Sequence, residues 1–152
     1  MSTSAPTLTT GPLTTALHVE HRGGDRFDIE IRGHTITVDQ PIDVGGDDTA
    51  PTPTELLVAS LASCVAFYAR RYLARHGLDT NGLAVHAAYE LADRPARVAA
   101  MHVQLMVPPG VPQSRLQPLL AVASHCTVHN TLVDPPRVSI TLAEKEPTCT
   151  PS

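Results

Sequence analysis

Two cysteines stand in settings that suit thiol chemistry. Cys64 lies within the uncharged run from Leu56 to Ala69, and Cys126 follows 62 residues later in ASHCTVHNTL, flanked by His125 and His129. A cysteine thiolate is a nucleophile and a metal ligand, and a protonated imidazole nearby lowers the pKa of a thiol. Redox chemistry is therefore one interpretation of this pair. The other is structural, because a free cysteine packs in a core like a small apolar residue.

A metal site is a further alternative for the second cysteine. His125, Cys126 and His129 offer three donors within five residues. Zinc takes four protein ligands, or three and a water, so Cys64 or another histidine would have to complete the set. Since no second paired motif supplies one, we expect no metal. Cys149 lies in a Pro/Thr-rich tail, and we assign it no role.

The element that carries Cys64 is predicted to be a long helix. Pro53 suits the first helical position, and Thr52 with Glu55 has the spacing of a capping box. Gly77 is expected just beyond the helix end. A helix that is apolar all round is expected to be buried all round, in a protein core or a subunit interface. Its uncharged run is shorter than the roughly 18 residues of a membrane span, so we expect no membrane partner.

Alternating apolar residues and turn residues predict the remaining elements. Strands and a second helix are expected, in chain order, over residues 16–22, 26–32, 34–39, 83–91, 97–107, 112–125 and 137–142. Residues 127–132 between the last two elements are expected to form a turn. This order predicts an α+β fold in which the apolar helix lies against a largely antiparallel sheet.

The length and composition bound the domain organisation and the partners. With 152 residues, we expect one domain over 16–143, between a disordered arm at 1–15 and a loose tail at 144–152. A net charge of −4 and 3% aromatic residues argue against nucleic acid as a partner. The first residues lack the pattern of a signal peptide, and three cysteines make no disulfide framework. Both observations favour a cytoplasmic, reducing location.

Several of these segments together resemble the OsmC/Ohr family. They are the loop and helix start GGDDTAPTPTELL, the helix ELLVASLASC with its continuation VAFYARRYLARHGL, and the second cysteine segment HCTVHNTL. The similarity runs from about Arg26 to Leu142. It is closer to the divergent OsmC-like branch than to Ohr proper, because Glu directly precedes Leu-Leu and VHNTL follows the second cysteine.

The resemblance implies both an architecture and an activity. The family fold is an α+β protomer that intertwines with a second copy, so that two long central helices are buried together in a homodimer. Its characterised members are thiol peroxidases that reduce organic hydroperoxides in oxidative-stress defence. By resemblance, Cys64 is the peroxidatic cysteine and Cys126 the resolving cysteine. A dithiol is the implied reductant, and no metal, flavin or haem is needed.

The resemblance also implies a group that stabilises the thiolate. In the hydroperoxide reductases this is an arginine from an early strand, for which Arg22, Arg26 and Arg32 are the candidates. A glutamate ten residues before the cysteine holds it, whereas Thr54 occupies that position here and Glu55 follows. We expect Glu55 to cap the helix. The alternative function is a non-catalytic binding or redox-sensing protein that holds a small apolar ligand in the dimer cleft.

Overall fold

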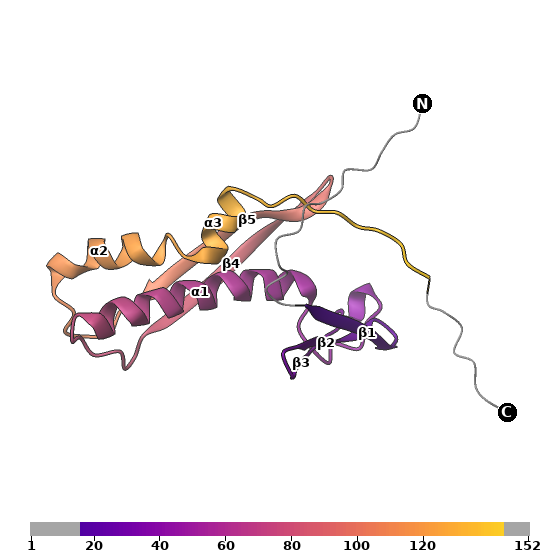
Figure 1. Cartoon of the computed structure of the whole chain (residues 1–152), viewed down its shortest axis with the longest axis horizontal. Helices are drawn as coiled ribbons and strands as arrows, with labels where there is room; N and C mark the ends of the chain where they lie inside the picture. The colour runs from indigo at the N-terminus through magenta and orange to yellow at the C-terminus, as the bar shows by residue number, and fades with distance from the viewer. Residues whose placement is uncertain (1–15, 145–152) are drawn as a thin grey trace. The chain divides into compact units, whose positions relative to one another are not determined.

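The computed structural model describes residues 16–144 of the chain (Figure 1). The expected arm, Cys149 and the rest of the tail lie outside the described residues. The described chain has an α+β fold with antiparallel strands, as predicted. It forms two compact units, each built from separate stretches of the chain. Their described parts are 16–60 with 87–103, and 61–86 with 104–144.

A three-stranded antiparallel meander forms the N-terminal part of the first unit (Figure 1). Its strands, β1 (Leu17–Gly23), β2 (Arg26–Ile31) and β3 (His34–Val38), match the predicted ranges closely. Ile31 pairs with His34, so the turn between β2 and β3 has only two residues. Arg32 and Gly33 in that turn have φ values of +52° and +82°. Two positive φ values suit the tight hairpins that match the twist of the strands.

Asp39 organises the loop that joins this sheet to the long helix. Its side chain is only 1% exposed. It accepts hydrogen bonds from the Thr49 backbone N (3.0 Å), the Thr49 Oγ1 (2.7 Å) and the Gln40 backbone N (2.8 Å). These donors, with the Thr49 hydroxyl foremost, lower the pKa of Asp39 to about 2. The short 3-10 helix η1 (Ile42–Val44) lies within the loop.

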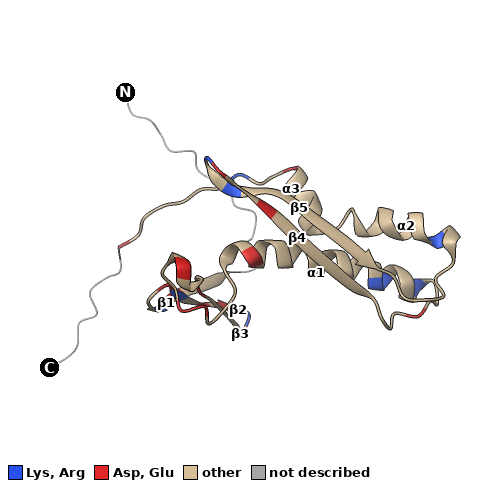
Figure 2. Cartoon of the chain, turned by 180° about the vertical axis from the view of Figure 1, so that it is seen from behind, with Lys and Arg blue, Asp and Glu red and all other residues tan. Residues whose placement is uncertain are grey.

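Helix α1 (Pro53–Arg75) starts and ends as its sequence predicts. The Thr52 N–H donates to Glu55 Oε2 (2.8 Å), while the Glu55 N–H donates to Thr52 Oγ1 (3.1 Å). This reciprocal pair is a capping box. Gly77, at φ +64°, ends the helix in the left-handed conformation. Figure 2 shows that charged residues lie only near the two ends of α1, and that its middle is uncharged.

The chain by itself buries only part of α1, so its expected burial on every side stays a prediction that depends on a subunit interface. By length and composition, the 23-residue helix could cross a membrane, and only 33% of its most apolar 18-residue window is buried. The expectation that this segment is too short to span a membrane is therefore wrong by length, because the helix extends beyond its uncharged run. Leu57 and Phe67 are 41% and 51% exposed. The reason is that the described residues cover one side of α1 and leave another side open.

A long hairpin follows, as predicted. Strands β4 (Ala84–Asp93) and β5 (Ala96–Met106) form a separate two-stranded sheet. On β5 the alternating side chains of Met101, Val103 and Leu105 are partly buried. On β4, Leu91 is 64% exposed.

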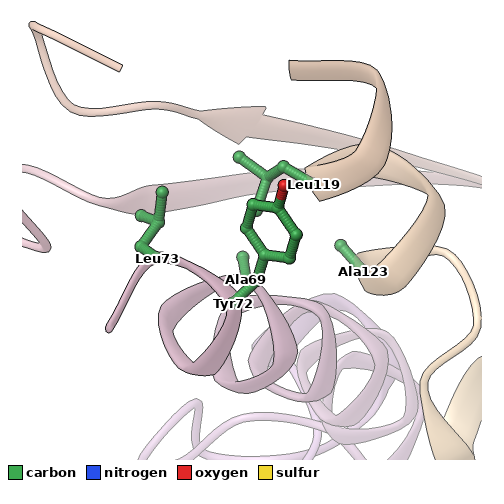
Figure 3. Close-up of a cluster of buried hydrophobic side chains, with 5 residues drawn as sticks. All are labelled: Ala69, Tyr72, Leu73, Leu119 and Ala123. Atoms are coloured by element: carbon green, nitrogen blue, oxygen red, sulfur yellow. The ribbon is translucent and has the colours of Figure 1, made fainter. Parts of the chain in front are cut away.

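The core of the second unit lies where α1 meets helix α2 (Gln113–Ala123). Its buried side chains are Ala69, Tyr72, Leu73, Leu119 and Ala123 (Figure 3). Leu73 and Leu119 are 0% and 1% exposed, so these two helices meet in a closely packed contact. Pro118 lies inside α2 and does not delay its start.

The C-terminal part of the chain corrects two predictions. The expected turn after Cys126 is helix α3 (Thr127–Val133). The expected strand at 137–142 does not form, although these residues run extended (Figure 1). Its alternating apolar side chains are almost fully exposed: Val138 is 80%, Ile140 91% and Leu142 102% exposed. A strand needs a hydrogen-bonding neighbour, and the described residues provide none for this segment.

Candidate active site

Cys64 lies in the middle of α1, inside the second unit. Its thiol is free and its side chain is partly buried. Leu61, one turn earlier on the helix, is buried, while Phe67, three residues later, is exposed. Cys64 therefore lies between the buried and the open sides of α1.

Cys126 occupies the cap position before α3. Its thiol is free and 0% exposed. The backbone is extended there, and the His129 N–H donates to Cys126 Sγ at 3.4 Å. Ser, Thr, Asp and Asn usually accept this capping hydrogen bond. Here a sulfur accepts it, so the thiol has a fixed orientation and a backbone donor.

The structure brings the two predicted cysteines together. Burial raises the pKa of the Cys126 thiol most, and a hydrogen bond and charge interaction with Cys64 raise it further. The backbone N–H groups of His129 and Val128 act in the opposite direction. Two free thiols that interact in this way are neighbours, which is the first requirement for a disulfide between them.

A second contact joins the same two segments. Tyr68 Oη lies 3.1 Å from Thr127 Oγ1. Tyr68 is four residues after Cys64 and so lies on the same side of α1, and Thr127 directly follows Cys126. Sequence reasoning missed this pair. The spacing of four residues from Cys64 could have indicated Tyr68. Nothing in the sequence indicated Thr127, which lies 59 residues after Tyr68.

The neighbouring histidines do not form the alternative metal site. His125 is exposed, and its Nδ1 donates to the Ala121 carbonyl oxygen (2.7 Å). Across residues 16–144, no group of three His, Cys, Asp or Glu side chains is placed to hold a metal ion. His129 Nδ1 is buried and, within the same range, has no hydrogen-bond partner.

With this geometry in view, the family can be assigned. The family model described as OsmC-like protein matches residues 45–141, which include both cysteines. This chain is an OsmC-like protein. It matches none of the curated proteins with which it was compared.

Solved OsmC-like structures share the fold. A protein from Psychrobacter arcticus, described as an osmotic stress induced and detoxification response protein, is 24% identical, with a TM-score of 0.73 over 82% of this chain and 91% of that one. The OsmC-like protein from Mycoplasma pneumoniae is 15% identical, with a TM-score of 0.69 over 81% and 89%. An organic hydroperoxide resistance protein from Elizabethkingia anophelis is 19% identical, with a TM-score of 0.59 over 82% and 90%. The predicted family and fold are therefore confirmed.

Glu55 and one of the candidate arginines of this OsmC-like protein, Arg22, have structural partners. Glu55 caps α1, as predicted. Arg22 lies on the surface, 2.8 Å from Asp28 and 3.1 Å from Glu20. Arg32 lies in the tight turn between β2 and β3. A role for one of the three arginines at the thiolate stays a prediction.

An apolar hollow lies beside the C-terminal half of α1. Its volume is about 310 Å³, and its lining residues are Tyr68, Arg71, Tyr72, Arg75, His76 and Val122. Tyr68 therefore contributes to this hollow and also contacts Thr127 next to Cys126. The lining residues of the hollow on α1 begin one helical turn beyond Cys64, at Tyr68, and continue to Arg75.

Proposed function

We propose that this OsmC-like protein is a thiol peroxidase that reduces organic hydroperoxides in oxidative-stress defence. Cys64 is the peroxidatic cysteine and Cys126 the resolving cysteine. The observation that carries the proposal is that two free thiols, one partly exposed and one fully buried, lie near enough for Cys64 to raise the pKa of Cys126. Family membership and the shared fold with organic hydroperoxide resistance proteins support it.

The chemistry needs only these two sulfurs and a reductant. The Cys64 thiolate attacks one peroxide oxygen, the O–O bond breaks, and the alkoxide leaves and takes up a proton to become an alcohol. Cys64 is then a sulfenic acid. Cys126 Sγ attacks Cys64 Sγ, the S–O bond breaks, water leaves, and a disulfide forms. A dithiol restores both thiols and is itself oxidised to a disulfide.

The surroundings of Cys64 favour an apolar substrate. The sulfur lies on an uncharged stretch of α1, and the apolar hollow begins near Tyr68. Burying alkyl surface contributes about 25 cal/mol per Å², which hydrogen peroxide cannot gain. An alkyl hydroperoxide should therefore react faster than hydrogen peroxide.

We also propose that the active form is a cytoplasmic homodimer. The open apolar side of α1 and the exposed row at 137–142 are surfaces that a second copy would cover. Free thiols that cycle through a disulfide suit a reducing compartment.

The decisive experiment is thiol trapping with mass spectrometry on the reduced protein after one equivalent of cumene hydroperoxide. Cys64→Ser, Cys126→Ser and Cys149→Ser run in parallel. We expect a Cys64–Cys126 disulfide within seconds in the parent chain and in Cys149→Ser. Cys126→Ser should instead retain a sulfenic acid on Cys64.

Three results would each count against a part of the proposal. If both thiols survive excess hydroperoxide for many minutes, the chain is not a peroxidase, and the alternative of a binding or sensing protein takes its place. If hydrogen peroxide and cumene hydroperoxide react at equal rates, the apolar substrate preference is wrong. Zinc that stays tightly bound to the purified protein would instead favour the alternative metal site at His125, Cys126 and His129.

A further inference from the structure

The two sulfurs of the proposed redox pair differ in how a reductant can reach them. Cys64 is partly exposed on α1, whereas Cys126 is 0% exposed at the start of α3. Thiol–disulfide exchange requires the incoming thiolate to contact the sulfur that it attacks, so access helps to decide which sulfur reacts. The fold therefore treats the two ends of a Cys64–Cys126 disulfide differently.

Backbone N–H groups around Cys126 also favour attack at Cys64, because they suit Cys126 to be the leaving sulfur. When the disulfide opens, one sulfur leaves as a thiolate and needs hydrogen-bond donors. The His129 N–H already points at Cys126 Sγ from 3.4 Å. The Val128 N–H also interacts with this sulfur, and both amides favour the charged thiolate. Burial disfavours the Cys126 thiolate and so slows its departure as the leaving group. It does not give a reductant access to Cys126.

We infer that a reductant opens the oxidised pair at Cys64 only, so that the mixed disulfide forms on Cys64 and Cys126 is always the leaving group. This inference rests on the redox pair of the proposed function. The backbone N–H of His129 is then a positioning group, since it holds the leaving sulfur and touches no reductant.

The exchange balances as follows. A reductant thiolate forms a bond to Cys64 Sγ while the Cys64–Cys126 bond breaks, and the electron pair moves to Cys126 Sγ, which takes up a proton. The second thiol of the reductant then attacks its own sulfur in the mixed disulfide. Cys64 leaves as a thiolate, and the reductant carries away an internal disulfide. Two electrons and two protons pass to the protein in total.

The inference also predicts a division of labour during one cycle. Cys64 meets every external molecule, first the hydroperoxide and then the reductant. Cys126 meets only Cys64. A buried thiol that reacts only inside the protein is protected from overoxidation and from adducts with other small thiols.

The test starts from a disulfide made without any hydroperoxide. Full-length Cys149→Ser protein is oxidised with diamide, freed of oxidant and mixed briefly with excess 2-mercaptoethanol. This monothiol has no second thiol to resolve the adduct. Acid in denaturant stops the exchange, N-ethylmaleimide labels the free thiols, and peptide mass spectrometry locates both groups. We expect the mercaptoethanol adduct on Cys64 and the maleimide on Cys126, at least tenfold over the reverse pattern.

A matched control separates the fold from the local sequence. The same oxidised protein, unfolded in guanidinium chloride before the monothiol is added, should give adducts on both cysteines in comparable amounts. In the folded protein, an adduct on Cys126 at equal or higher yield would overturn the inference. A preference for Cys64 that persists unchanged in denaturant would also overturn it.

The outcome is distinguishable from failure of the proposed function. Diamide does not depend on peroxidase activity, so selective attack at Cys64 can hold even if hydroperoxides leave the protein unchanged. Conversely, rapid peroxide turnover with attack at Cys126 would leave the peroxidase intact and remove this inference. If diamide forms no Cys64–Cys126 disulfide, both are wrong.

Discussion

The Tyr68 hydroxyl lies 3.1 Å from the Thr127 hydroxyl, and this contact joins the helix that carries Cys64 to the segment that begins with Cys126. A side-chain hydrogen bond of this kind contributes about 0.5–1.5 kcal/mol. Its position gives it a second effect, because it helps to hold the two sulfurs within reach of each other.

Tyr68→Phe should therefore slow formation of the Cys64–Cys126 disulfide a few-fold and lower stability by about 1 kcal/mol. Stopped-flow mixing with cumene hydroperoxide, followed by acid quench and mass spectrometry, gives the rate. Tyr89→Phe, which removes a hydroxyl from the first unit, is the matched control and should behave as the parent chain does. An unchanged rate in Tyr68→Phe would mean that the contact does not position the sulfurs.

The resolving step should speed up with increasing pH. Burial and Cys64 raise the pKa of Cys126, so at neutral pH its thiolate is a small fraction that grows by about tenfold per pH unit. If Cys126 attacks as the thiolate, the rate of disulfide formation rises between pH 7 and 9. Preformed Cys64 sulfenic acid, followed by rapid quench across that range, measures the slope. A flat profile would contradict attack by the Cys126 thiolate.

Glu55→Gln tests whether Glu55 only caps α1 or also takes part in the chemistry of Cys64. Glutamine also accepts from the Thr52 N–H, so the capping box remains in part and the loss of stability should stay below about 1 kcal/mol. The rate of Cys64 oxidation should not change. Thr52→Ala, which removes the other half of the box, should cost about 0.5–2 kcal/mol with the rate again preserved. A large loss of rate in Glu55→Gln alone would give Glu55 a role in the chemistry.

Acid should loosen the loop between β3 and α1. The pKa of folded Asp39 is lowered to about 2, below that of an unfolded aspartate, so the unfolded state binds the proton first as the pH falls. Its contribution to stability is fully present above about pH 5 and is lost as the pH falls toward 2. Thermal unfolding from pH 7 to 2 should show a smaller drop in Tm for Asp39→Asn, which starts from a lower Tm. Parallel curves for the two proteins would rule out Asp39 as the source.

The exposed row at 137–142 should contribute to association. Ile140→Lys places a charge on the apolar side of the extended segment, where Ile140 is 91% exposed. We expect a homodimer in the parent chain and a shift toward monomer in this variant, measured by analytical ultracentrifugation. Thr141→Lys, one residue along and on the opposite side, should remain dimeric. Equal dissociation constants for the two variants would exclude this segment from the interface.

Local features of the fold could be read from the sequence, and long-range ones could not. The capping box of Thr52 and Glu55 and the stop at Gly77 depend on neighbours within a few residues, and both are correct. Helix α3 was missed because Thr127, Val128 and Thr131 are β-branched and disfavour helices. Its cap comes from Cys126, an uncommon residue in that position.

In the candidate active site, too, the sequence indicated the residues but not their long-range contacts. Residue types and settings selected Cys64 and Cys126, yet neither their contact nor the burial of Cys126 follows from a separation of 62 residues. The alternation at 137–142 predicted a strand, and that prediction is wrong for this chain. It could not supply the neighbouring edge that would make the segment a strand in this chain.

The two compact units alternate along the chain, since it passes from one to the other after Ser60, after His86 and after Val103. Neither unit is encoded by a continuous piece of gene. A single protease cut or a simple truncation therefore cannot release one of them whole. Cys64 and Cys126 lie on separate stretches of the second unit, and the chain passes through the first unit between them.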